Sequence, residues 1–180
     1  ENENTTSFDL LPTKQQMNIV MSLNNRLLKD DQVVVSRNVL IHKLTPHRQE
    51  MHLTCSLDVI HGALEEAEFE VPTGFQISQV TTELLGQWEV IENPETQTAR
   101  LLVKLRQPTR EDIVLNITAT LDQPATGDWQ AREIRPLNVA GNVSVVGVLA
   151  DIGLKTARVV SDGVIPIDHD FLMAAIPSTI

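Results

Sequence analysis

The alternation of apolar and polar side chains from Met51 to Val59 is the feature that most constrains how this chain can fold. Every second residue of the stretch is apolar, and a polar residue stands between each pair. Successive side chains of a strand point to opposite faces of a sheet, so this period predicts a strand buried on one face. The single cysteine, Cys55, stands on the apolar face. We therefore expect a small buried hydrophobe there rather than a nucleophile.

The same period of two recurs in residues 66–71, 101–105 and 113–121. Turn residues 107–112 separate the last two segments, which together predict a β-hairpin. The polar positions of the first segment are glutamates on one face of one strand. That placement predicts a solvated acidic stripe and not the opposed carboxylates of a glycoside hydrolase. The glutamates are Glu66, Glu68 and Glu70.

Later segments are less regular but still favour strands. Residues 129–134 predict a short strand, and the continuous apolar run 143–149 predicts a strand buried on both faces. Residues 156–160 and 164–167 flank a turn and predict a second hairpin. No helical pattern of useful length follows residue 30, which argues against folds that need crossover helices. The sequence therefore predicts an all-β fold, an antiparallel β-sandwich.

The first part of the chain is polar at residues 1–13, which we expect to form a flexible N-terminal segment. Residues 14–28 fit two structures. Their apolar spacing matches a short helix, and the alternation from Met17 to Leu23 matches a strand. Residues 29–31 would serve the strand as a turn into the next apolar run. We expect residues 14–180 to form one β-sandwich domain, excised from a longer chain.

The net charge of −10, from 14 basic and 24 acidic side chains, restricts the partners of the chain. Such a field repels phosphate backbones and anionic lipid heads, so we expect no nucleic-acid binding. No stretch of 18 apolar residues occurs, so we expect no direct membrane insertion. One cysteine permits neither a disulfide within the chain nor a cysteine-based metal site.

The order of strand types from Met51 to Leu121 resembles modules of large exported bacterial proteins that string β-sandwich domains together. An amphipathic strand leads to the acidic segment LEEAEFEVPTGFQISQV and the tryptophan-containing GQWEV. The paired segments in ARLLVKLRQPTREDIVLNITATLDQP follow. The resemblance implies a sandwich or super-sandwich module in an extracytoplasmic chain, whether periplasmic, cell-surface or secreted. It implies no active-site residues.

Three residues are the candidates for ligand binding: Trp129, Asp168 and Asp170. Trp129 is flanked by polar residues and is the better of two tryptophans for stacking on a sugar, since Trp88 alternates with Val90 on a strand and is expected in the core. Asp168 and Asp170 would share one side of a strand, and two such carboxylates can bind calcium. We expect no other cofactor.

The histidines offer a hypothesis for a zinc site. His42 and His52 would meet across a hairpin that turns near Pro46, but no third ligand stands at a diagnostic spacing. Surface positions on a polar strand face are the simpler interpretation.

Three functions remain open from these residues. The favoured hypothesis is a non-catalytic structural or protein-interaction module of a larger exported bacterial protein, whose partners are other domains of the same chain or another protein. The second is a carbohydrate- or calcium-binding accessory domain. The third, with least support, is a metal-dependent enzyme.

Overall fold

The fold is all-β over residues 32–93, 98–123, 129–154 and 165–167, which are the residues that the computed structural model describes. No helix occurs among them. Within the same residues, no helix is long and apolar enough to cross a membrane. The strands are β1 (Val33–Leu44), β2 (Gln49–His61), β3 (Leu64–Val71), β4 (Gln76–Thr81), β5 (Leu85–Asn93), β6 (Thr98–Thr109), β7 (Ile113–Leu121), β8 (Arg135–Pro136) and β9 (Gly141–Ala150).

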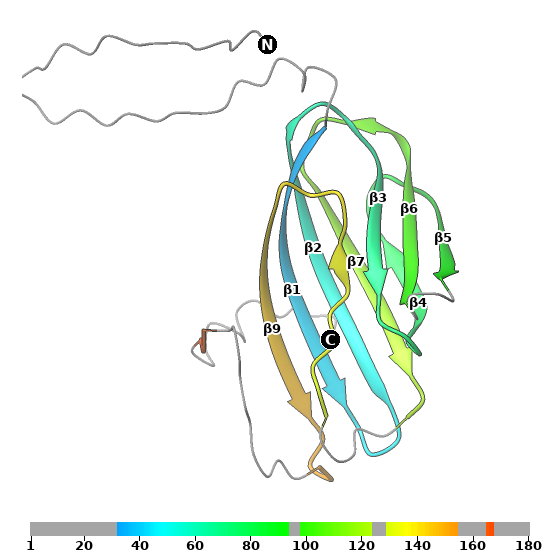
Figure 1. The fold of residues 1–180 in the computed structure, drawn as a ribbon, viewed down its shortest axis with the longest axis vertical. Coiled ribbons are helices and arrows are strands. Elements are labelled where there is room, and N and C mark those ends of the chain that lie inside the picture. Colours follow the sequence, from blue (N-terminus) through cyan, green and yellow to red (C-terminus); the bar gives the residue numbers. More distant parts are fainter. Residues whose placement is uncertain (1–31, 94–97, 124–128, 155–164, 168–180) are drawn as a thin grey trace, which may run out of the picture.

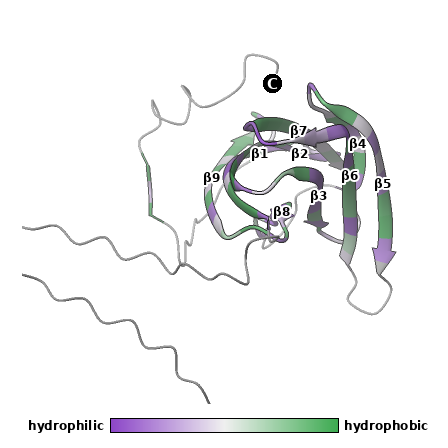
Figure 2. Ribbon diagram, turned by 90° about the horizontal axis from the view of Figure 1, so that it is seen from above, coloured by the Kyte–Doolittle hydropathy of each residue, from purple (hydrophilic) through white to green (hydrophobic). Residues whose placement is uncertain are grey.

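The strands form two sheets that pack face to face. Sheet A has the order β4-β7-β2-β1-β9, and sheet B has the order β5-β6-β3-β8 (Figure 1). Seen from above, the two sheets form two layers, with β5 and β9 at opposite margins (Figure 2). Every strand pair is antiparallel except β1 with β9, which is parallel. The predicted antiparallel β-sandwich is confirmed, with one parallel pair added.

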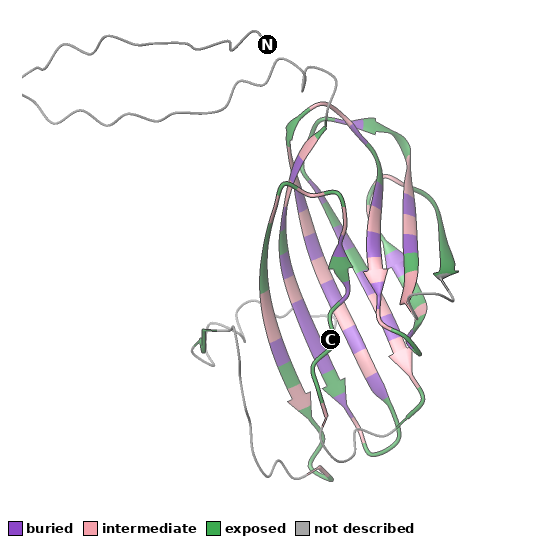
Figure 3. Cartoon of the chain, viewed as in Figure 1, coloured by how far each residue is buried: buried purple, intermediate pink, exposed green. Residues whose placement is uncertain are grey.

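The core lies between the sheets and is built from the alternating positions of the central strands. Figure 3 shows this alternation as bands along β2, β7, β3 and β6. Burial of each large side chain contributes roughly 1.5–3 kcal/mol, so these four strands dominate stability. The fully buried side chains include Met51, Leu53, Cys55, Phe69, Leu101, Val103, Leu115 and Ile117.

The predicted hairpin between residues 101–105 and 113–121 is wrong, because β6 and β7 belong to different sheets. The connection between them is an arch that crosses the core. Asp112 anchors it, since its carboxylate accepts a hydrogen bond at 3.2 Å from the backbone N–H of Val59 on β2. Two strands that face each other across a core show the same alternation as two strands that pair side by side. The pattern alone therefore could not separate the two arrangements.

The apolar run 143–149 is a strand, β9, but the prediction that both its faces are buried is wrong. β9 is an edge strand, and Val143 is 64% exposed. Polar side chains help to hold it against β1: the Asn142 Oδ1 accepts hydrogen bonds from Ser36 Oγ at 2.8 Å and Asn38 Nδ2 at 2.7 Å. The apolar run therefore forms an edge strand and not a central strand of the sheet.

The strand predicted at residues 129–134 is also wrong. These residues are irregular, and only Arg135 and Pro136 pair with β3. Ile134 is nevertheless buried in the core, so its apolar character reflects packing without a strand.

Several predictions fall outside the described residues. They concern the flexible segment 1–13, the helix or strand at 14–28, and the strand at 156–160 with most of its predicted hairpin.

Candidate functional site

Trp129, the candidate for stacking on a sugar, is half-buried at the inner face of sheet A. Its indole N–H donates a hydrogen bond to Gln49 Oε1 at 2.9 Å. Its ring meets the imidazole of His42 edge-on, with the ring centroids 5.2 Å apart and the planes at 80°. Both the polar end and part of the apolar surface of Trp129 are thus engaged within the protein.

His42 faces inward because it shares the inner side of β1 with Leu40 and Leu44. Its side chain is buried, and its Nε2 has no hydrogen-bond partner among residues that the structure describes. Burial lowers the pKa of His42 to about 4, and a hydrogen bond with the Arg132 backbone opposes that shift. His42 is therefore a neutral imidazole at neutral pH, packed beneath Trp129.

His42 and His52 do not form the pair that a metal site would need. In the β1–β2 register His42 lies opposite Met51, and His52 lies opposite Ile41. Residues that are directly opposite point to the same face, so the two histidines point to opposite faces of sheet A. His52 Nε2 lies 3.5 Å from a Glu50 carboxylate oxygen on the outer face. No group of three or more metal-ligating side chains occurs in the described part of the chain.

Asp168 and Asp170 lie outside the described residues, so the calcium site that they would form stays a prediction.

Cys55 and the glutamate stripe take the scaffold roles that the alternation predicts. Cys55 is buried, and burial raises the pKa of its thiol to about 12, which leaves negligible thiolate for chemistry. Glu68 forms an ion pair with Arg100 at 3.4 Å, and Glu70 pairs with Arg135. These contacts make the stripe a charged outer surface of sheet B.

Trp88 belongs to a surface that the strand patterns do not predict. Its alternation with Val90 predicts a core position, but Trp88 is 37% exposed, and Val90 is 40% exposed. Both lie opposite fully buried residues of β6, Val103 and Leu101, so they continue the apolar inner face of sheet B past the closed core.

The reason for this exposure is the position of β5 at the margin of sheet B, where it pairs with β6 alone among the described strands. On its other face Ile91 is 50% exposed. We call the exposed side chains of Trp88 and Val90 the β5 face. The exposure of these side chains depends on the order of the strands in the sheet, and the side-chain pattern of a single strand does not contain that order.

Comparisons with known proteins add a distant likeness. No protein-family model matches the sequence, and no curated protein gives a significant match. Leukotriene A4 hydrolase from Saccharomyces cerevisiae is similar over 59% of this chain and 18% of its own, at 12% identity and a TM-score of 0.42. An M1 zinc metallopeptidase from Deinococcus radiodurans is similar over 55% of this chain and 22% of its own, at 14% identity and a TM-score of 0.35. The matched part is less than a quarter of either chain, and no activity or zinc site is carried over from them.

Proposed function

We propose that this chain is a non-catalytic structural and protein-interaction module of a larger exported bacterial protein, and that it docks through the β5 face. Its partner is a protein surface with an apolar centre and a basic rim. That surface belongs to another domain of the same chain or to another protein. The observation that carries the proposal is the exposure of Trp88 and Val90 on one face of an edge strand.

An edge strand with large exposed apolar side chains is a surface that proteins normally cover or interrupt with charge. The neighbouring strand β6 is covered on the same face, because Leu101 and Val103 are fully buried next to Val90 and Trp88. Aromatic side chains at such positions are typical anchors of protein interfaces.

The charge around the β5 face defines the rim of the partner. Glu89 and Glu92 lie on β5 itself, both exposed, and neither forms an ion pair among the described residues. With a net charge of −10 on the chain, basic side chains on the partner would speed association and fix its orientation.

The absence of a catalytic role is part of the same proposal. Cys55 and His42, which are buried in the described part of the chain, are both held uncharged by burial at neutral pH. Trp129 is engaged by Gln49, which favours interaction through β5 over sugar stacking through Trp129.

The test compares hydrogen exchange of this chain alone with that of the same chain within its full-length gene product. We expect the amides of β5 to exchange at least about tenfold more slowly in the full-length protein. Val90→Asp should abolish that protection, and Val114→Asp, at another exposed valine on β7, should leave it intact. Equal exchange in both contexts, with no partner lost on Val90→Asp, would contradict the proposal.

The alternative of a carbohydrate- or calcium-binding domain has its own test. A ligand that binds only the native state raises the melting temperature. A clear rise with calcium or with a glycan from an array would favour that function over ours.

A further inference from the structure

One edge of β3 is only partly covered. On one side β3 pairs with β6 along its length, but on the other β8 reaches only Phe69 and Glu70. The backbone N–H of Leu137 adds one hydrogen bond, at 2.8 Å to the carbonyl of Glu68. No described strand pairs with this edge from Leu64 to Ala67. Because backbone groups alternate along a strand, the N–H and C=O of Glu66 point to the same open edge as the Glu68 carbonyl.

The gap arises where the chain leaves sheet B for sheet A. After β8 it bends at Asn138, which has a φ of 57°, and the Ala140 N–H donates to the Val34 carbonyl at 2.8 Å. β9 then pairs with β1 from Val35 onward. The start of β1, before Val35, and the start of β3, before Glu68, therefore have no strand beside them on this edge among the described residues.

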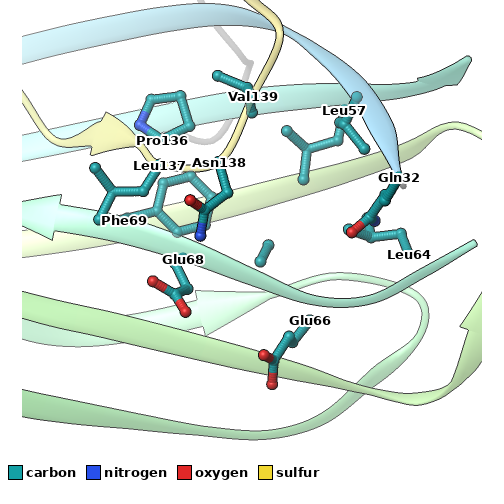
Figure 4. A pocket seen from close by; sticks show the side chains of 12 residues that line it. Gln32, Leu57, Leu64, Glu66, Glu68, Phe69, Pro136, Leu137, Asn138 and Val139 are labelled. Atoms are coloured by element: carbon teal, nitrogen blue, oxygen red, sulfur yellow. The ribbon is translucent and has the colours of Figure 1, made fainter. Parts of the chain in front are cut away.

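A cavity of about 100 Å³ lies beside the open edge (Figure 4). Gln32 and Leu64 lie at one end of it, and Leu137 and Asn138 lie at the other. Its lining mixes apolar side chains, among them Leu57 and Phe69, with polar ones, among them Gln32 and Asn138. An apolar side chain placed against Leu57 and Phe69 would be removed from water, which favours such an occupant. Among the described residues, the acidic groups in its wall are Glu66 and Glu68, and no basic residue lines it.

The sequence supplies an occupant that matches this edge in pattern, charge and position. Apolar residues alternate from Met17 to Leu23, as a strand over a half-buried groove requires. The region from Leu10 to Lys29 has no acidic side chain, in a chain whose net charge is −10. Its basic residues are Lys14, Arg26 and Lys29.

The segment is joined to the cavity wall by a short stretch of chain. Gln32, which follows the turn predicted at residues 29–31, is itself part of the cavity wall. A β-carbon added at Gly62 would lie 3.1 Å from the Gln32 Cα, so Gln32 sits at the head of β3. β1 and β3 run in the same direction (Figure 1), so a strand that turns back into β1 would run antiparallel to β3.

We propose that residues 17–23 form an additional strand of sheet B, paired antiparallel with β3 at Leu64–Ala67 and with one apolar side chain in the cavity. Addition of a strand to an open edge uses backbone hydrogen bonds for affinity and side-chain pockets for specificity. The short tether gives the segment a high effective concentration at the edge. This inference is independent of the β5 proposal, and neither fails with the other.

The first test is disulfide cross-linking in the full chain. Glu66→Cys is combined in turn with Val20→Cys, Ser22→Cys and Asn24→Cys, whose side chains would lie on the outer face of the added strand. Two cysteines cross-link only when their Cα atoms lie about 4.4–6.8 Å apart. The native Cys55 is buried with a raised pKa, so it should not compete. We expect one pair to form an intramolecular disulfide on mild oxidation.

The matched control replaces Glu66→Cys by Glu89→Cys on β5, an exposed strand glutamate away from the cavity. It should give no cross-link with the same partners. Equal cross-linking with both positions would overturn the proposal. Disulfides at Glu66 that link two molecules would also overturn it, in favour of a strand supplied by a second copy.

The second test is hydrogen exchange of residues 64–68 in the full chain. In the proposed strand Met21 would face the cavity, so Met21→Asp should speed exchange of these amides at least about tenfold. Ser22→Asp, on the opposite face of the same strand, should change them little. Exchange that is fast in the wild type and unaffected by either variant would contradict the added strand.

Discussion

The centre of the sandwich and its β5 edge carry the same alternation of side chains but bury them to very different degrees. On β2 the inward residues Met51, Leu53 and Cys55 are almost completely buried, whereas Trp88 and Val90 on β5 keep more than a third of their surface exposed. β2 has a neighbour on each side, and β5 has only β6 among the described strands. Alternation thus tells which face of a strand is apolar, and the place of the strand in its sheet tells whether that face is covered.

The largest expected effect tests this comparison with two aromatic side chains. Phe69→Ala removes a fully buried ring and should lower the free energy of unfolding by about 3–5 kcal/mol. Trp88→Ala removes a larger ring from the β5 face and should cost less than Phe69→Ala. Urea denaturation of both variants measures the difference, and equal costs would mean that the edge is as well packed as the centre.

A second expected effect concerns His42 and is a dependence on pH. Burial holds the pKa of His42 at about 4, against 6.5 for an unperturbed imidazole. Between these values the unfolded chain binds a proton that the folded chain does not. The free energy of unfolding should therefore fall as the pH falls from 6.5 to 4, and this contribution should level off below pH 4. The shift corresponds to about 3 kcal/mol.

The measurement for His42 is urea denaturation across this pH range in the wild type and in His42→Leu. The variant should lose most of the pH dependence that the wild type shows between pH 6.5 and 4. His61→Gln, at an exposed histidine, should retain it. Identical slopes in His42→Leu and the wild type would show that the imidazole takes up its proton in the folded state.

A third expected effect is a difference in stability between alanine substitutions at two glycines, Gly86 on β5 and Gly141 on β9. A β-carbon at Gly86 would lie 2.9 Å from the Lys104 carbonyl oxygen, where the β5–β6 register shifts. Gly86→Ala should therefore cost about 1–3 kcal/mol through overpacking against backbone. At Gly141 the nearest atoms are side-chain carbons of Val35 at 3.7 Å, so Gly141→Ala should be tolerated. Thermal unfolding of the two variants should rank them in this order.

The smallest expected effect is at Ile91, on the outer side of β5. Ile91→Thr keeps a β-branched side chain and should change the free energy of unfolding by no more than about 0.5 kcal/mol. A loss of several times that size in urea denaturation would show that the outer side of β5 is covered by the chain itself.

Strand existence could be predicted from the sequence wherever the alternation was long. The predicted segment 113–121 has the same bounds as β7, and residues 51–59 lie within β2. Partnership could not be predicted, because the period of two is identical for strands that pair and strands that face each other. The β6–β7 arch and the exposed β9 both follow from that limit.

The candidate site was harder to predict than the fold. His42 and His52 are separated by the β1–β2 register, and a shift of one residue would have brought them to the same face. The partners of Trp129 come from the distant residues His42 and Gln49. The exposure of Trp88 depends on the order of whole strands. Each of these facts is a property of the assembled sheets.

The parallel pairing of β1 with β9 has a consequence for the time course of folding. Ser36 and Asn142, which are register partners and share a hydrogen bond, are 106 residues apart in the sequence. A ribosome that adds about 5–20 residues per second needs on the order of 5–20 s to make the intervening chain. Throughout that interval β1 has been synthesised, but β9, its partner on this edge, has not. Closure of sheet A on this side is thus a late event, and the nascent chain is most open to aggregation or chaperone binding along β1 before it.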